Sequence, residues 1–277
     1  HSKHMNTRWV FNVESWIPTK DQLLAISGFI QPIEKDRISK YVFMKDAKST
    51  LIGRLMMRKY LSTVTTIPYE CIELGRHEHG KPYLAGCGDT SVSFNISHQG
   101  DFVVCAGNTE HNIGIDIMKI EPPANKDIPE FFRIMRRQLS DEEWKRVESY
   151  KTDAEKIACF YRFWCLKESY VKNIGLGLNI PFDEMTFHIK EELKVGEFVR
   201  SSHLVANGAL KHEYVFEESL LNESYMVAVA LNTPNKEYEI EGYQTLNIED
   251  LIRDAKPFVK EEPAFAYNFL KKEAKPF

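Results

Sequence analysis

The sequence predicts an α+β fold made of two halves, each with a long helix against a small antiparallel sheet. Apolar residues recur at spacings of three and four over 34–62 and again over 155–174, the period of a helix with one buried face. Short segments of alternating polarity follow each of these helices, over 72–118 and over 184–231. The repeated order of helix and strands indicates the two-part architecture.

The composition is typical of a soluble globular protein. The 277 residues are 43% hydrophobic and 27% charged, and the net charge of −4 gives no reason to expect a nucleic-acid partner. The five cysteines include no CxxC pair, which favours reduced thiols in a cytoplasmic protein over a disulfide framework or a zinc site. No apolar run is long enough to span a bilayer, so we expect no membrane partner. Residues 1–4 look like an expression-tag remnant ahead of a natural Met5.

The first half is expected to span residues 8–114. Thr19 followed by Gln22 is a capping box and predicts the start of a short helix. One continuous helix is expected from Glu34 to about Ser62. The strands expected here are residues 8–14, 72–74, 82–84, 92–97 and 102–106; the fourth is half-buried by its alternation and forms a hairpin with the fifth.

The second half is expected to span residues 115–232, and the charged, proline-containing segment 233–277 is expected to wrap over the body. Ser140 with Glu143 predicts a helix start, and Gly175 ends the helix that begins near Glu155. Helices are expected over 131–137, 140–150 and 155–174, and strands over 113–118, 184–189, 204–205, 214–218 and 225–231.

Glu168 lies at the edge of the apolar stripe of the 155–174 helix, four residues before Lys172. A carboxylate in that position is costly unless a cation meets it. A salt bridge to Lys172 on a solvated face would meet this need and contribute a few tenths of a kcal/mol. The sequence leaves both possibilities open for Glu168: a simple salt bridge with Lys172, or a role in the chemistry of a site. The stripe is expected to consist of Ile157, Phe160, Tyr161, Trp164, Val171 and Ile174.

Asp116 lies on the alternating strand 113–118, with Gly114 beside it on the same face. The glycine leaves room for another molecule, or another backbone, to approach. Asp116 could be an acid on the wet face of an edge strand. Together with Glu168 it could instead hold Mg²⁺, which proteins bind with one or two carboxylates, substrate phosphates and water.

Basic and polar residues gather in two further segments of the first half. Arginine, lysine and backbone amides suit phosphate binding, although a loop that bears histidines is also often solvated surface. The residues are Arg76, His77, His79 and Lys81 around Gly80, and Asn95, Ser97 and His98 at a strand end.

Four motifs occur in order: Gly80-Lys-Pro82, Asn95-Ile-Ser-His98, Ile113-Gly-Ile-Asp-Ile117 and Trp164-Cys-Leu-Lys-Glu-Ser-Tyr-Val-Lys172. On these motifs the chain resembles the Sfp-type 4′-phosphopantetheinyl transferases over roughly Trp9 to Leu231. Four segments are similar to the animal branch of that family, which serves aminoadipate-semialdehyde dehydrogenase: Lys35-Asp-Arg-Ile38, Gly53-Arg-Leu-Met-Met-Arg-Lys59, Asn95-Ile-Ser-His-Gln-Gly-Asp101 and Pro129-Glu-Phe-Phe-Arg-Ile-Met135.

The resemblance implies two pseudo-symmetric halves with coenzyme A in the cleft between them, and a monomer. It implies transfer of 4′-phosphopantetheine from coenzyme A to a serine of carrier domains, those of fatty acid synthase and aminoadipate-type carriers, with release of 3′,5′-ADP. Asp116 and Glu168 would hold Mg²⁺, or Mn²⁺ as an alternative. Glu168 would also accept the serine proton, and Lys172 would stabilise phosphate charge. Coenzyme A would be bound by Arg37, Arg76, Lys81, Asn95, Ser97, His98 and Gln99.

The chain departs from many bacterial members at Met118, where they carry a second acid. A thioether is a poor ligand for a hard cation, so water or the Gln99 amide would fill that position. A basic run beside two phenylalanines, Arg133, Arg136 and Arg137, could dock an acidic carrier or could be a solvated helix face.

Two other functions compete with the transferase. A Mg²⁺-dependent kinase or nucleotidyl transferase would use similar acids, but the sequence has no phosphate-binding GxxxxGK[ST] loop and no kinase motif set. A coenzyme A- or carrier-binding protein without turnover would be expected to have lost Glu168 or Lys172, and both are present.

Overall fold

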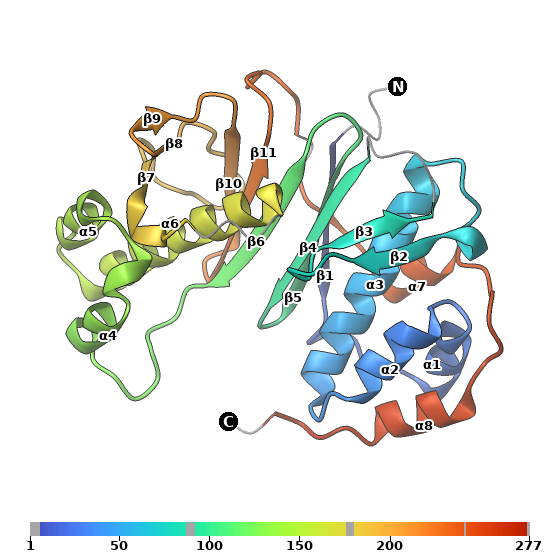
Figure 1. Ribbon diagram of the computed structural model, residues 1–277. Coiled ribbons are helices and arrows are strands. Elements are labelled where there is room, and N and C mark those ends of the chain that lie inside the picture. Colours follow the sequence, from blue (N-terminus) through green and yellow to red (C-terminus); the bar gives the residue numbers. More distant parts are fainter. Residues whose placement is uncertain (1–5, 87–91, 176–179, 241, 276–277) are drawn as a thin grey trace. The chain divides into compact units, whose positions relative to one another are not determined.

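The computed structural model describes residues 6–86, 92–175, 180–240 and 242–275 (Figure 1). They form two compact units. The first contains the described residues up to Glu110 and those from 242 onward, and the second is His111–Ile240. Helices and antiparallel strands occur in both units, which confirms the α+β class. Residues 1–4, expected to be a tag remnant, lie outside the described residues.

The first unit is built on a four-stranded sheet in the order β12-β1-β5-β4. The predicted hairpin is confirmed, and Gly100 between its strands has φ 56°. Helix α3 (Met44–Val64) packs on β4 and β5, and its buried side chains include Leu51 and Leu55. The strands are β1 (Asn6–Asn12), β4 (Ser93–Gln99), β5 (Phe102–Asn108) and β12 (Gln244–Thr245), with a separate antiparallel pair, β2 (Glu73–Arg76) and β3 (Pro82–Ala85).

The single long helix expected from Glu34 to Ser62 is wrong. Two helices, α2 (Pro32–Ser39) and α3, are separated by a short extended stretch. Phe43 has φ −95° and ψ 138° and forms a β-bridge with Glu273. The Met44 N–H donates to the Glu273 carbonyl at 2.8 Å. Because this pairing holds the backbone extended, the helical pattern is interrupted there.

The C-terminal segment is an integral part of the first unit and does more than wrap over it. Helix α8 (Pro263–Leu270) packs on α1 (Lys20–Ser27), which begins with the predicted Thr19–Gln22 capping box. The segment also contains β12, which pairs with β1 in parallel, and α7 (Ile248–Ile252). Its buried side chains in the core of the first unit are Leu246, Ile248, Leu251, Phe265, Ala266 and Phe269.

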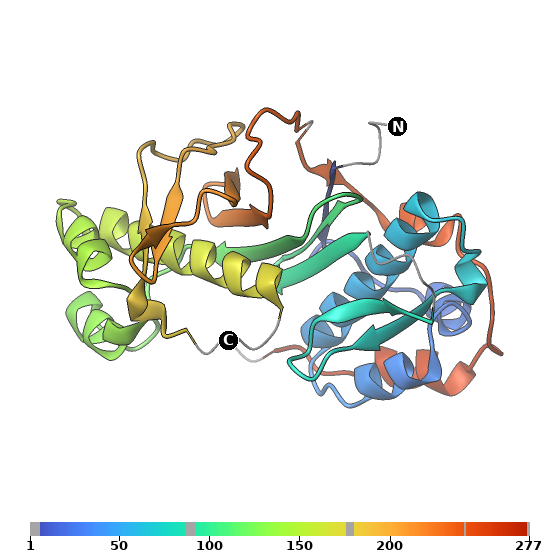
Figure 2. The same ribbon diagram turned by 45° about the horizontal axis from the view of Figure 1, so that its top comes forward.

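The second unit is built on the antiparallel sheet β10-β11-β6, with helix α6 (Asp153–Ile174) lying along it (Figure 2). The expected boundary between residues 114 and 115 falls inside β6 (Ile113–Lys119). The capping box of Ser140 with Glu143 is confirmed at the start of α5. The other elements are α4 (Ile128–Ile134), α5 (Asp141–Glu148), β7 (Met185–His188), β8 (His203–Ala206), β9 (Ala209–Leu210), β10 (Val215–Asn222) and β11 (Tyr225–Leu231), with short 3-10 turns at Tyr69–Cys71, Arg136–Gln138 and Phe182–Glu184.

The buried face of α6 is wider than the predicted stripe. Ile157 and Phe160 are buried, and the other predicted residues, Tyr161, Trp164, Val171 and Ile174, are half-buried and pack against the same core. The face also includes polar side chains that find their partners on other elements, such as Arg162, whose Nε donates to Glu218 at 2.7 Å. No helix among the described residues has the length and apolar character needed to cross a membrane.

Candidate functional site

Gly114 brings strand β6 and helix α6 into direct backbone contact. A Cβ at this position would lie 2.3 Å from the Ser169 carbonyl oxygen and 2.4 Å from the Asn173 nitrogen. The glycine therefore makes room for another backbone, one of the two explanations that the sequence left open. Asn173 ties the same turn of α6 to the sheet, because its Nδ2 donates to the Ala230 carbonyl at 2.8 Å.

Asp116 is placed against α6 by this contact. Its side chain lies two residues beyond Gly114 and is 6% exposed, so the wet-face interpretation is wrong even though β6 is an edge strand of its sheet. Lys172 Nζ donates to Asp116 Oδ1 at 3.0 Å. No ion pair joins Glu168 to Lys172 in the part of the chain that the structure describes. Lys172 therefore pairs with Asp116 on the strand and not with Glu168, which lies one turn away on the same helix as Lys172.

Glu168 is half-buried one turn before Lys172. Burial raises the pKa of its carboxyl group, and the nearby charge of Asp116 raises it further. Lys172 acts in the opposite direction, as does the Trp164 indole, whose buried Nε1 lies near Glu168 but outside hydrogen-bonding geometry. The two acids are thus close enough to repel each other, one on a strand and one on a helix.

This donor set fits a hard divalent cation that is shared with a phosphate. Among the described residues no group of three or more His, Cys, Asp or Glu side chains could enclose a metal. Met118, which belongs to the core of the second unit and is 7% exposed, has a thioether and no side-chain oxygen to offer a hard cation. Asp116 and Glu168 are then the protein ligands available, the number with which Mg²⁺ is usually held beside substrate phosphates and water.

The residues predicted to bind coenzyme A all belong to the first unit. Arg37 lies on α2, and Arg76 ends β2 and donates from Nη1 to the Gly80 carbonyl at 3.1 Å. Burial lowers the pKa of Arg76, and the charge of Arg37 lowers it further. Lys81 directly precedes β3, and burial lowers its pKa to about 8.

Strand β4 carries the other predicted residues of this set. Asn95 and Ser97 are only 4% and 7% exposed and Phe94 on the other face is 4% exposed, so the strand is buried on both faces there and the prediction of a half-buried strand is wrong. His98 and Gln99, at the end of the strand, are exposed. Arg54 is a buried cation of the first unit that was not among the predicted site residues. Arg54, on α3, is 4% exposed, and its spacing along the helix gave no sign of that burial.

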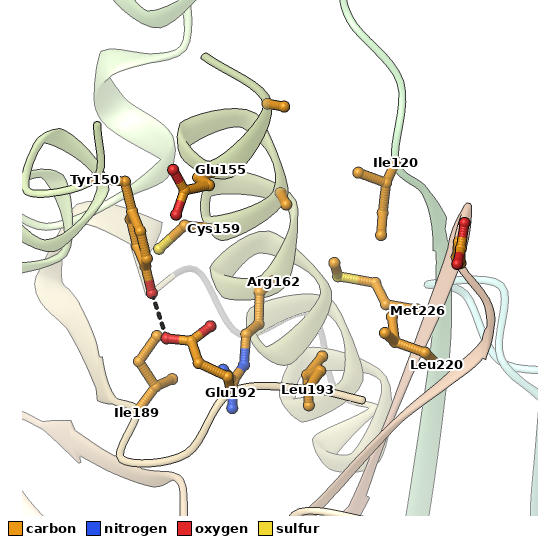
Figure 3. Close-up of a pocket in the computed structure, with 13 residues that line it drawn as sticks. Ile120, Tyr150, Glu155, Cys159, Arg162, Ile189, Glu192, Leu193, Leu220 and Met226 are labelled. Atoms are coloured by element: carbon orange, nitrogen blue, oxygen red, sulfur yellow. Dashed lines mark hydrogen bonds between the residues drawn. The ribbon is translucent and has the colours of Figure 1, made fainter. Parts of the chain in front are cut away.

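A cavity of about 610 Å³ in the second unit contains none of the predicted site residues (Figure 3). It lies along the N-terminal half of α6, beside Cys159 and Arg162, whereas Glu168 and Lys172 lie in the C-terminal half. The Tyr150 hydroxyl donates to Glu192 at 2.7 Å within it (Figure 3). The acid pair of Asp116 and Glu168 is therefore a site separate from this cavity.

Comparison with known proteins decides between the functions left open. The family description "4′-phosphopantetheinyl transferase, N-terminal" matches residues 14–110, and "4′-phosphopantetheinyl transferase superfamily" matches residues 112–230. L-aminoadipate-semialdehyde dehydrogenase-phosphopantetheinyl transferase of Rattus norvegicus is 38% identical over 276 residues, which cover 93% of this chain and 89% of that protein. The chain belongs to the 4′-phosphopantetheinyl transferase family.

Other members of this phosphopantetheinyl transferase family give the same result. The Homo sapiens protein of the same description is 38% identical over 93% of this chain and 89% of its own length. The 4′-phosphopantetheinyl transferase Sfp of Bacillus subtilis is 30% identical over 64% of this chain and 74% of its own length. The resemblance predicted from the four motifs is confirmed. This phosphopantetheinyl transferase is an enzyme that uses coenzyme A and acts on carrier protein domains.

Proposed function

We propose that this phosphopantetheinyl transferase moves the 4′-phosphopantetheine arm of coenzyme A onto a serine of acyl and aminoadipate-type carrier domains in a Mg²⁺-dependent reaction. The observation that supports this best is the meeting of Asp116, Glu168 and Lys172 on a facing strand and helix. The serine Oγ forms a bond to the phosphorus nearest the pantetheine. The bond from that phosphorus to the bridging oxygen breaks, and 3′,5′-ADP leaves.

Glu168 is the proposed acceptor of the serine proton. A hydroxyl is a poor nucleophile until a base takes its proton, and a base works best when its pKa lies near the working pH. Burial and the charge of Asp116 move the pKa of Glu168 upward in that direction. Before Mg²⁺ binds, the raised pKa gives Glu168 more proton affinity than an exposed glutamate has.

Asp116 and Glu168 are also the proposed ligands of Mg²⁺. Bound there, the ion would neutralise charge on the diphosphate. Lys172 then has a second role. Its Nζ is paired with Asp116, but its side chain is 31% exposed, so it can reach a phosphate oxygen when another cation takes over the carboxylate. Lys172 would stabilise the charge that develops on the transferred phosphate or on the leaving group.

The residues of the first unit are proposed to bind the nucleotide end of coenzyme A. Arg37, Arg76 and Lys81 supply positive charge that suits phosphate, and the pKa shifts of Arg76 and Lys81 show that burial makes this charge costly without an anion. The polar side chains Asn95, Ser97, His98 and Gln99 complete the proposed set.

The carrier is proposed to dock on the exposed basic residues Arg133, Arg136 and Arg137. Phe132, next to them, is buried in the core of the second unit, so the run presents charge and not aromatic rings. Ile134, which is 55% exposed between the arginines, supplies an apolar contact. An acidic carrier surface would be attracted to this face, and the attraction would weaken with added salt.

Reversing both Arg136 and Arg137 to Glu tests the docking face. The matched control reverses two exposed lysines of the first unit, Lys256 and Lys260, and so changes the net charge equally. Carrier affinity and its salt dependence should fall only in the arginine variant. Equal carrier affinities of the arginine variant and the lysine control would contradict the proposed docking face.

The transfer itself is tested by incubation with coenzyme A, Mg²⁺ and apo-carrier domains, read by intact mass. The carrier should gain one phosphopantetheine unit. Glu168→Gln should abolish the gain while coenzyme A still binds, and Glu142→Gln, an exposed control on α5, should be active. No gain on any fatty-acid or aminoadipate-type carrier with the unmodified enzyme would overturn the proposed function.

A further inference from the structure

The cavity along the N-terminal half of α6 has the size of a ligand-binding site. Its volume of about 610 Å³ falls within the range of sites that hold drug-sized molecules. Its walls include α6, the stretch that follows β7, and the hairpin of β10 and β11. The lining is mainly apolar, with Ile120, Ala158, Ile189, Leu193, Leu220 and Met226 among its members. The cavity therefore suits the apolar part of a small molecule.

The cavity lies on the side of α6 that faces away from the acid pair. Cys159, which lines it, comes nine residues before Glu168, or about two and a half turns at 3.6 residues per turn. The two side chains therefore leave the helix in opposite directions. Asp116 and Lys172 are not among the described residues that line the cavity. A molecule bound there would leave the acid pair free for its own ligands.

The cavity is preformed, because polar contacts and a β-bridge tie its walls together. Arg162 Nη1 donates to the Glu191 carbonyl at 2.8 Å. The Nε and Nη2 of the same arginine donate to the two carboxylate oxygens of Glu218 at 2.7 and 3.0 Å. A β-bridge joins Val195 to Leu220 on β10. Walls that are already ordered lower the entropic cost of binding a ligand.

Negative charge exceeds positive charge among the side chains that line the cavity. The lining arginine, Arg162, is neutralised by its salt bridge. Of the lining glutamates, Glu192 pairs with Arg146 at 3.4 Å. Glu155 and Glu223 have no salt bridge to any residue in the described part of the chain. An apolar ligand with a cationic group is therefore favoured over one with an anionic group.

Glu223 is the carboxylate best placed to receive that cation. Glu155 already accepts a hydrogen bond from the Thr152 hydroxyl at 2.8 Å, whereas none to the Glu223 side chain is found among the described residues. Glu223 lies in the turn between β10 and β11 and is exposed, which places it at the opening of the cavity. An ammonium group there keeps part of its hydration while an attached alkyl chain is buried.

We propose that this cavity binds a small apolar molecule that carries a primary amine, with its apolar part against α6 and its ammonium group at Glu223. The Tyr150 hydroxyl, which donates to Glu192 within the cavity, offers a second polar contact (Figure 3). The site belongs to the second unit alone, so binding of the amine does not depend on the proposed transfer reaction.

Dansylcadaverine is the probe, because its fluorescence rises in apolar surroundings and its alkyl chain ends in a primary amine. Dansyl-aminohexanoic acid is the matched control ligand, since it has the same ring and alkyl chain but ends in a carboxylate. The amine should bind about tenfold tighter than the acid, because attraction of one and repulsion of the other add up. Mg²⁺ added at constant ionic strength should not displace the amine, because the acid pair lies elsewhere.

Three variants locate the bound probe. Ala158→Phe should abolish binding by filling the cavity, because Ala158 is a half-buried lining residue. Glu223→Lys should lower the preference for the amine over the acid by about tenfold. The matched control is Glu237→Lys, which makes the same charge change at an exposed position of the second unit outside the lining, and it should keep the preference. The amine should also raise the Tm of the unmodified protein and of Glu237→Lys.

Several results would overturn the inference. They are no fluorescence change with the unmodified protein, equal affinities for the amine and the acid, binding that survives in Ala158→Phe, and displacement by Mg²⁺. If Ala158→Phe fails to fold, the smaller filling variant Ala158→Leu and the surface variant Glu223→Lys decide the question. Loss of carrier modification would not affect the result, because none of these measurements uses transfer.

Discussion

Gly114→Ala should misplace the acid pair without touching either acid. The new Cβ would lie 2.3 Å from the Ser169 carbonyl oxygen and 2.8 Å from the Asn173 Cα, and ordinary contact begins near 3.4 Å. Strand β6 and helix α6 must therefore separate by about 1 Å, since both obstacles are backbone atoms that no rotamer change can move. The same displacement would stretch the 3.0 Å contact between Lys172 and Asp116.

Gly114→Ala is expected to lower both the free energy of unfolding and the rate of transfer. Overpacking of this kind lowers the free energy of unfolding by about 1–3 kcal/mol. A displacement of about 1 Å in a catalytic arrangement lowers the rate by roughly a hundredfold. Urea denaturation measures the first effect and intact-mass assays of carrier modification measure the second. The loss in rate should greatly exceed any loss in coenzyme A affinity, because the nucleotide is proposed to bind residues of the first unit.

Gly53→Ala is the control for this prediction. It adds the same methyl group in the interior of α3, where the new Cβ would meet only the terminal Cδ1 of Ile96, at 2.7 Å, and that side chain can move. We expect its transfer rate to stay close to that of the unmodified enzyme. If Gly114→Ala also kept full stability and rate, β6 and α6 would not be held at the separation that we infer.

Three further predictions concern the same helix and its ligands. Lys167→Met should lower the free energy of unfolding by about 3–5 kcal/mol, because Glu143 would stay buried without its cation; urea denaturation measures this, and adding Glu143→Leu should recover part of the loss. The affinity of the free enzyme for Mg²⁺ should fall as pH decreases through the raised pKa of Glu168, at a higher pH than for an ordinary glutamate, because the proton and the cation compete for this carboxylate; a Mg²⁺ affinity that does not change over that range would argue against Glu168 as a ligand. Removing divalent cations with EDTA should stop transfer and Mg²⁺ should restore it, so an unchanged rate in EDTA would contradict metal binding by Asp116 and Glu168.

Local signals in the sequence were enough to predict many element starts and the strand that carries the first acid. The box formed by Ser140 and Glu143 needs only residues three apart, and it is confirmed. The second role of Glu143 could not be predicted, because its Oε2 accepts from the Phe187 N–H, 44 residues away in the chain. Likewise, the break before α3 depends on Glu273, which no local pattern reveals.

The site was predictable in its residue types but not in its pairings. The spacing of four residues on the helix suggested Lys172 as a salt-bridge partner of Glu168. In the structure Lys172 is paired with Asp116 instead. Helical periodicity also failed to find Arg54, because polar side chains on a long helix are usually solvated and this one is buried. The burial of a charge is decided by elements distant in sequence. Whether a charged side chain is buried is therefore hard to predict from sequence alone.

The discontinuity of the first unit has a consequence for the order in which the protein folds during synthesis. The second unit is one uninterrupted stretch and can fold once it has emerged from the ribosome, whereas the first lacks β12, α7 and α8 until residues 244–270 have also been synthesised. Until then the core positions that Phe265 and Phe269 will cover are open to solvent, and Arg58 lacks the Phe258 ring. The first unit is therefore begun before the second unit and completed after it, and its open core is exposed to aggregation during that interval.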